Sequence, residues 1–150
     1  MMTAKDIMSK DVITVTKKTS TEELSKLFIK HRVSGIPVVD ENGGLLGVVT
    51  QADLIEQKKN LHIPTVIALF DAVILLETQK KFETDVKKLT GSCVEDIYTP
   101  NAISVNLDTE FRDVASLMSE KDIHTLPVLD GEKLVGIIGK LDLIRGISES

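Results

Sequence analysis

Thr50 and Asp53 are the side chains whose types and spacing best suit the binding of a small polar ligand. They stand three residues apart, where an apolar run at 45–49 gives way to a helical pattern. A phosphate or hydroxyl at a helix start meets unpaired backbone N–H groups and the positive end of the helix dipole. The threonine hydroxyl can donate to a phosphate, and the carboxylate can accept from both hydroxyls of a ribose. The same spacing also fits a capping box, and both roles can be filled at once.

The motif around these two residues occurs twice in the chain. The run GVVTQADLI at 47–55 returns as GIIGKLDLI at 136–144, and IPVVD at 36–40 returns as LPVLD at 126–130. A shorter match, DIM at 6–8 and DIY at 96–98, precedes each of them. Such a duplication predicts two similar units, with ligand sites in the clefts between them.

The second copy departs from the first at one of the two positions. Gly139 stands where the first copy has Thr50, while Asp142 matches Asp53. The acceptor for a ribose is therefore kept and the hydroxyl donor is lost. Glycine at this position can simply cap the helix. Lys140 would replace the lost donor only if its side chain turned inward, and we favour a solvated lysine.

Each copy is predicted to run strand, helix, strand, strand, helix. Short first strands are expected at 12–15 and 102–105. Ser20 with Glu23 is expected to cap the first helix, and Asp108 the second. The helices carry apolar stripes of three residues each: Leu24, Leu27 and Phe28, then Val114, Leu117 and Met118.

The second half of each unit is predicted to be a hairpin followed by a closing helix. A short buried strand at 36–39 can carry a proline at its start, and the turn at 40–44 leads to a strand at 45–49. The second turn, at 130–133, is shorter. Closing helices are expected to begin near Thr50 and Gly139. The predicted fold class is α+β, with two β-α-β-β-α units packed in pseudo-two-fold symmetry.

Residues 57–92 separate the copies and are predicted to be helical. Pro64 can open a helix, residues 66–76 are apolar on nearly all sides, and residues 79–89 are amphipathic, with Gly91 as a stop. A helix this apolar needs a partner surface on its own module or on a second chain, and we favour a homodimer. The predicted organisation is a first motif at 1–56, the helical insertion at 57–92 and a second motif at 93–150.

The repeats resemble CBS motifs, named after cystathionine β-synthase, and the pair resembles a CBS (Bateman) module. The run HRVSGIPVVD at 31–40 is similar to the pattern in the γ subunit of AMP-activated protein kinase. The resemblance covers about residues 3–56 and 93–147. It implies a regulatory module that needs no cofactor and binds an adenosyl ligand such as AMP, ADP, ATP or S-adenosylmethionine. It does not imply catalysis.

The resemblance also implies which residues share a cleft, because each cleft draws on both copies. Thr50 and Asp53 would share one cleft with Thr99, Ile103, Ile123 and His124, and Asp142 would share the other with Ser9, Ile13, Val33 and Ser34. The apolar members would sandwich the base, and backbone groups near Val33 and Ile123 would read its edge. Without a ligand, the same apolar residues would pack in a core.

Three further residues have two interpretations each. His31 and Arg32 resemble a phosphate-binding pair, since the donor fork of arginine matches phosphate oxygens, but they equally suit a solvated cationic helix end. In the second copy the matching residues are Lys121 and Asp122, and an aspartate would repel a phosphate. His124 could stack on a base, although we favour a polar residue at a strand edge.

The composition narrows the function classes. The net charge of −5 argues against non-specific nucleic-acid binding, and no apolar run approaches the roughly 20 residues of a membrane span. The lone Cys93 excludes an internal disulfide and fits a reducing compartment, and the short leading segment leaves no room for a signal peptide, so we expect a cytoplasmic protein. No metal-ligand spacing or nucleophile–base pair is evident.

The leading hypothesis is therefore a regulatory nucleotide-binding module. With no effector domain in the sequence, its output would act in trans on an unknown partner protein. The alternative is a structural or dimerisation module without ligand binding, which Gly139 and Asp122 in the second copy favour. We do not expect an enzyme.

Overall fold

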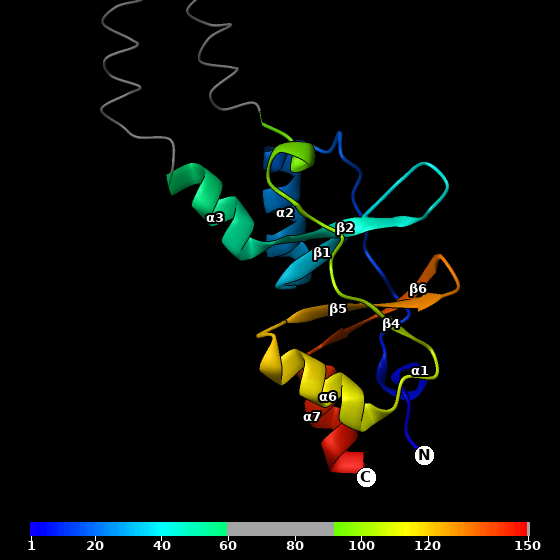
Figure 1. Cartoon of the computed structure of the whole chain (residues 1–150). Helices are drawn as coiled ribbons and strands as arrows, with labels where there is room; N and C mark the ends of the chain where they lie inside the picture. The colour runs from blue at the N-terminus through cyan, green and yellow to red at the C-terminus, as the bar shows by residue number, and fades with distance from the viewer. Residues whose placement is uncertain (60–91, 150) are drawn as a thin grey trace, which may run out of the picture.

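The computed structural model describes residues 1–59 and 92–149, which form two similar halves (Figure 1). The first half holds α2 (Thr21–His31), β1 (Gly35–Val39), β2 (Leu45–Thr50) and α3 (Gln51–Lys59). The second half holds β4 (Val105–Asn106), α6 (Phe111–Glu120), β5 (Thr125–Asp130), β6 (Lys133–Gly139) and α7 (Lys140–Glu149). Within the described residues there are three further short elements: α1 (Ala4–Ile7), the 3₁₀ helix η1 (Val94–Asp96) and β3 (Thr99–Pro100). The predicted α+β class with two related units is confirmed.

Each half contains a three-stranded sheet built on an antiparallel hairpin. The strand orders are β1-β2-β3 and β4-β5-β6, and the central pairs include Ile36 with Val49 and Leu126 with Ile138. The four side chains of these pairs are buried, as the apolar runs predicted. In the first turn, Asp40 Oδ1 accepts hydrogen bonds from the N–H groups of Asn42 and Gly44, at 2.9 and 2.8 Å.

The leading segment of each copy packs on the other half, which the sequence did not predict. Ala4 and Ile7 of α1 belong to the core of the second half, and α1 lies beside α7 (Figure 1). Ser9 exchanges backbone hydrogen bonds with Ile137 of β6, at 2.8 and 3.0 Å. In the same way, Val94 of η1 is buried in the core of the first half, and β3 pairs with β2. The two halves are therefore interlocked.

The interlocking explains why the predicted first strands are wrong in extent. Of residues 12–15, only Val15 pairs, in a parallel bridge to Val38 of β1. In the second copy the expected strand at 102–105 is reduced to β4, which starts at Val105. These segments cross from the sheet of one half to the sheet of the other, so they can pair with a strand only at their ends.

The long helices form as the apolar stripes predicted, but only one predicted cap is correct. Ser20 Oγ accepts a hydrogen bond from the Glu23 N–H at 3.1 Å, which confirms the first cap. Asp108 does not cap α6, whose N-cap residue is Glu110. The chain makes a separate turn before α6, closed by a 3.1 Å hydrogen bond from the Asn106 N–H to Thr109 Oγ1. The stripe residues Leu24, Phe28, Val114 and Met118 are all buried.

Pro37 lies in the middle of β1 and not at its start. Its carbonyl accepts a hydrogen bond from the Val15 N–H at 3.1 Å, on the edge of β1 that faces away from β2. An N–H at position 37 would point to the same edge, where the crossing segment offers no ladder partner. The proline therefore costs the sheet no hydrogen bond.

The two halves also lie close together where β1 and β5 begin. A Cβ atom built on Gly35 would lie 2.6 Å from Thr125 Oγ1, so this position excludes any larger residue. The expected helix near Pro64, with its apolar and amphipathic parts, lies outside the described residues. Among the helices of residues 1–59 and 92–149, none is both long and apolar enough to cross a bilayer.

Candidate functional site

A cleft of about 620 Å³ opens between the halves at the carboxyl end of β2 and the start of α3. We call it the Thr50 cleft, and both copies contribute to it. The first copy supplies Ser34, Val48, Thr50, Gln51 and Ala52, and the second supplies Thr99, Asn101, Ala102, Ile103, Asp122, Ile123, His124 and Thr125. The lining therefore combines apolar side chains with hydroxyl and amide groups, which suits a ligand with a flat apolar part and a polar part.

The structure brings together five of the residues that the sequence analysis assigned to one cleft. Thr50 lies at the end of β2, and the four others come from the second copy: Thr99, Ile103, Ile123 and His124. Ile103 is 41% exposed, so this apolar side chain is accessible on the cleft wall and is not committed to a core. Asp53 is not among the residues that line the cleft; it is half-buried and hydrogen-bonded to Thr50, which does line it.

Thr50 and Asp53 hold each other in a reciprocal arrangement at the start of α3. The Thr50 N–H donates to Asp53 Oδ2 at 2.9 Å, and the Asp53 N–H donates to Thr50 Oγ1 at 3.1 Å. These two hydrogen bonds are those of a capping box, so the capping interpretation is correct. It leaves two groups for a ligand, because the Thr50 hydroxyl keeps its proton to donate and Asp53 Oδ1 has no hydrogen-bond partner among the described residues.

The predicted set of unpaired N–H groups at this helix start is largely absent. The amides of Thr50 and Asp53 are bonded to each other's side chains, and the Gln51 N–H donates to the Ser34 carbonyl at 3.0 Å. Only the Ala52 amide lacks a partner within the described part of the chain. The expectation that a phosphate would meet several free amides here is wrong, because the cap motif uses two of them and the Ser34 carbonyl a third.

Asp142 occupies the matching position in the second half with a different set of partners. Its Oδ2 accepts from the Gly139 N–H at 2.7 Å, and its Oδ1 lies 3.0 Å from Arg145 Nη2. The residue is only 9% exposed. Both of its carboxylate oxygens are therefore engaged within the protein, whereas Asp53 has one oxygen free.

The backbone groups proposed to read a base also differ between the halves. Gln51 Nε2 donates to the Val33 carbonyl at 2.7 Å, which occupies that acceptor. In the second copy, the Ile123 N–H donates to the Met118 carbonyl at 3.0 Å, but within the described residues nothing donates to the Ile123 carbonyl. The Ile123 carbonyl is thus available to accept from an exocyclic amine of a base in the Thr50 cleft.

Ser34 was predicted to share a cleft with Asp142, but the structure places it in the lining of the Thr50 cleft. Its Oγ lies 3.1 Å from Thr125 Oγ1 and donates to the His124 carbonyl at 3.4 Å. Two other residues assigned to the Asp142 cleft, Ile13 and Val33, pack against the core of the first half. For these two, the core-packing interpretation describes what the structure shows.

His31 and Arg32 lie away from the Thr50 cleft. His31 ends α2, and Arg32 is the C-cap residue, with φ of 52° and a hydrogen bond from its N–H to the Phe28 carbonyl at 2.9 Å. Both side chains are exposed, and Arg32 lines a shallow groove between α2 and α3. The structure therefore matches the solvated helix-end interpretation for this pair.

His124 and Asp122 are hydrogen-bonded side chains on the rim of the Thr50 cleft. His124 Nε2 lies 3.2 Å from Asp122 Oδ1, and the histidine side chain is 46% exposed. The sequence analysis did not assign Asp122, Gln51 or Asn101 to this cleft. The alignment of Asp122 with Arg32 between the two repeats could have pointed to Asp122. No motif points to Gln51 or Asn101.

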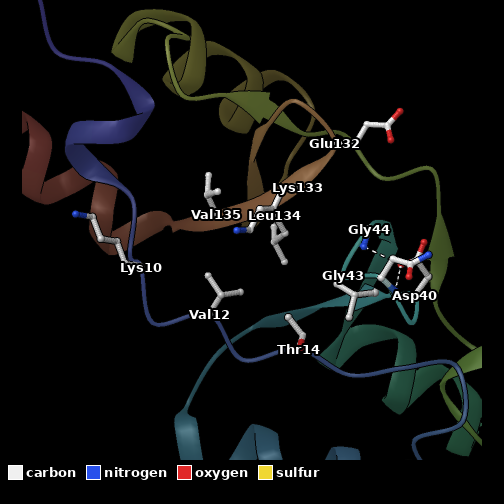
Figure 2. A pocket seen from close by; sticks show the side chains of 12 residues that line it. Lys10, Val12, Thr14, Asp40, Gly43, Gly44, Glu132, Lys133, Leu134 and Val135 are labelled. Atoms are coloured by element: carbon white, nitrogen blue, oxygen red, sulfur yellow. Dashed lines mark hydrogen bonds between the residues drawn. The ribbon is translucent and has the colours of Figure 1, made fainter.

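A second cavity, of about 640 Å³, lies at the opposite, turn end of the strands. Figure 2 shows side chains of β6 facing Val12 and Thr14 of the crossing segment, with the turn around Asp40 closing one side. No residue of the repeated runs at 47–55 and 136–144 lines it. Asp40, its best acceptor, already holds two amides of its own turn, so the Thr50 cleft remains the better candidate site.

Known proteins resemble this chain over nearly its whole length. The CBS domain model matches residues 4–60 and 94–149 of the chain. The uncharacterized protein MJ1426 of Methanocaldococcus jannaschii is 31% identical over 157 residues, an alignment that covers 98% of this chain and 92% of the relative.

Two solved structures share the fold at more than a quarter sequence identity. CBSX2 of Arabidopsis thaliana in complex with AMP gives a TM-score of 0.76 at 27% identity, covering 99% of this chain and 98% of that one. The CBS domain pair of protein MJ0100, in complex with 5′-methylthioadenosine and S-adenosyl-L-methionine, gives 0.72 at 29% identity, covering 99% and 98%. The chain spans 56% of the full CBSX2 sequence.

Proposed function

The chain belongs to the CBS domain family, and we propose that its Thr50 cleft binds an adenosyl ligand whose binding regulates a partner protein. The observation that carries the proposal is the free Asp53 Oδ1, held beside a cleft with an accessible apolar wall. A carboxylate oxygen in this position can accept from ribose hydroxyls, while Thr50 can donate and the Ile123 carbonyl can accept from the base. The related CBSX2 and MJ0100 structures contain adenosyl ligands, which supports this class of ligand.

The regulatory part of the proposal concerns conformational equilibrium. Residues from both copies line the cleft, so a bound ligand would contact both halves at once. A ligand shifts an equilibrium only if it binds two arrangements with different affinity. We propose that the relative position of the halves is the quantity that the ligand changes, and that a partner protein in trans recognises the change.

The direct test is a calorimetric titration with AMP, ADP, ATP and S-adenosylmethionine. We expect at least one to bind below millimolar concentration. Asp53→Asn keeps an acceptor for the Thr50 amide but replaces the free oxygen by an amide donor, so affinity should fall tenfold or more. Asp142→Asn is the matched control, because Asp142 lies in the other half and both of its carboxylate oxygens already contact protein groups. Equal losses in both variants would show that the site is wrongly assigned.

A homodimer is the second part of the proposal. Ile55 of α3 and Ile144 of α7 occupy matching positions in the two repeats and are 68% and 59% exposed, and Leu141 is 75% exposed. Apolar groups exposed at equivalent places favour association with a second copy of the chain. We expect the double variant Ile55→Arg/Ile144→Arg to sediment as a monomer, with Glu132→Lys in the far turn as the control. An unchanged mass of the double variant would exclude these helices from a dimer interface.

A further inference from the structure

The charged groups at the Thr50 cleft are unusual for a site that would hold a phosphate. Of the described residues that line it, none is a lysine or an arginine. The titratable side chains there are Asp122 and His124. Any positive charge on His124 is offset by the Asp122 carboxylate 3.2 Å away, so the lining offers no net cation to a ligand.

The backbone does not make up for the missing cation. A helix start binds anions through its free N–H groups, but the amides of Thr50, Gln51 and Asp53 are already hydrogen-bonded. One amide, that of Ala52, and the Thr50 hydroxyl remain as donors. These can hold an uncharged hydroxyl or a thioether-bearing ribose, but they cannot compensate the two negative charges of a nucleoside monophosphate.

With His124 uncharged, Asp122 gives the cleft rim a net negative charge, which is unfavourable to anions. It follows α6 in the left-handed conformation, with φ of 50°, and its matching residue in the first copy is Arg32, with φ of 52°. The same backbone position thus carries opposite charges in the two halves. The Asp122 side chain is 93% exposed, so water and salt weaken its repulsion, and an effect of several-fold per phosphate charge is the appropriate scale.

We propose that the Thr50 cleft selects adenosyl ligands without phosphate groups, and that Asp122 is the residue that determines this specificity. Neutral thionucleosides and the cationic sulfonium S-adenosylmethionine fit the cleft, and AMP and ATP are discriminated against in order of their charge. This inference rests on the proposed function, since it names the ligand class of the same site. It also narrows the predicted ligands, because the adenine nucleotides become the disfavoured members.

The test is a set of titrations with 5′-methylthioadenosine, S-adenosylmethionine, AMP and ATP at one low salt concentration. For the unmodified protein we expect the first two to bind at least tenfold more tightly than AMP, and ATP most weakly. Asp122→Asn should improve AMP binding several-fold and leave 5′-methylthioadenosine within twofold. Asp122→Arg, whose backbone geometry Arg32 already shows to accept arginine, should improve AMP more than tenfold and weaken S-adenosylmethionine.

Glu132→Lys changes the net charge as much as Asp122→Arg but lies at the turn end, so it should leave all four affinities unchanged. AMP or ATP binding as tightly as 5′-methylthioadenosine, with a loss in Asp53→Asn, would overturn this inference and leave the proposed function intact. Failure of all four ligands to bind would overturn both. An equal gain in AMP affinity from Glu132→Lys would show that net charge, and not Asp122, is responsible.

Discussion

The two halves of the molecule share a backbone and differ in how they use the aspartate of the repeated motif. Asp53 gives one oxygen to the amide at the start of α3 and keeps the other free, whereas Asp142 gives its second oxygen to Arg145. The residue that matches Arg145 in the first half is Glu56, which cannot make this pair. One half therefore retains an acceptor for a ligand, and the other uses the same acceptor internally.

This difference shows how a duplicated unit can separate binding from structure. Asp142 is nearly buried and doubly bonded, so it contributes to holding α7 against its sheet. Asp53 is half-buried and singly bonded, so it contributes less to stability and remains available for a ligand. Substitutions at matching positions in the two halves test this division between binding and structure.

The largest expected effect concerns the exchanged leading segments. Ile7 is 4% exposed in the core of the second half, while its match Ile97 is only partly buried against the first. Ile7→Ala should lower the free energy of unfolding by about 2–4 kcal/mol, because a buried isoleucine is replaced by a cavity. Ile97→Ala should cost clearly less. Urea denaturation with a common slope measures both values.

Lys5→Ala, on the exposed face of α1, serves as the control and should change the midpoint little. If Ile7→Ala cost no more than Lys5→Ala, α1 would not be anchored in the second half. The interlocking of the halves would then be absent in solution.

Much of the fold could be predicted because it depends on local patterns. Ser20 as a cap, the stripe through Leu24 and Phe28, and the turn at Asp40 are properties of a few neighbouring residues. The exchange of α1 and η1 could not be predicted this way. Burial of Ile7 depends on residues about a hundred positions away, and nothing in the run around it distinguishes one half from the other as its partner.

The candidate site shows the same division. The spacing of Thr50 and Asp53 predicted their mutual hydrogen bonds. That Thr50 would line a cleft shared by both copies was implied by the resemblance to CBS motifs. It could not show that Gln51 would take the Ser34 carbonyl, or that its side chain would take the Val33 carbonyl. These contacts decide which backbone groups stay free, and they form only when β1 and α3 are brought together.

The second expected effect compares the two aspartates by their contribution to stability. Asp142→Ala removes the bond to the Gly139 amide and the pair with Arg145, and should cost about 1–2 kcal/mol. The pair itself contributes at most a part of this, because Arg145 is 57% exposed. Asp53→Ala removes one capping bond and should cost about 0.5–1 kcal/mol. A greater loss from Asp53→Ala in urea denaturation would contradict the proposed division of roles.

A smaller effect is expected when the missing hydroxyl is restored to the second half. A Cβ on Gly139 would have its nearest neighbours at 3.8 Å, and no positive φ restricts the position, so Gly139→Thr fits without strain. Its hydroxyl could accept from the Asp142 N–H as Thr50 does from Asp53. The free energy of unfolding should rise by about a few tenths of a kcal/mol, the usual difference between glycine and threonine at a helix cap. A lowered melting temperature would show that the second half cannot take the geometry of the first.

The smallest expected effect concerns the short caps that begin the exchanged segments. Asp6 Oδ2 accepts from the Thr3 N–H at 2.8 Å and the Thr3 hydroxyl at 3.1 Å, while Asp96 Oδ2 accepts from the Cys93 N–H at 3.0 Å and its thiol at 3.6 Å. The Thr3 backbone bond, and then the Thr3 hydroxyl, lower the pKa of Asp6 below its usual 3.8. A lowered pKa means that the stabilisation is present above 3.8 and is lost as pH falls through the folded value.

Because asparagine resembles the protonated acid, Asp6→Asn should melt slightly lower than the unmodified protein near pH 6, and the two melting temperatures should converge as pH falls below 3.8. Asp96→Asn should have a smaller effect near pH 6, since a thiol is the weaker donor. A difference between Asp6→Asn and the unmodified protein that stayed constant with pH would show that the carboxylate charge does not hold the α1 cap.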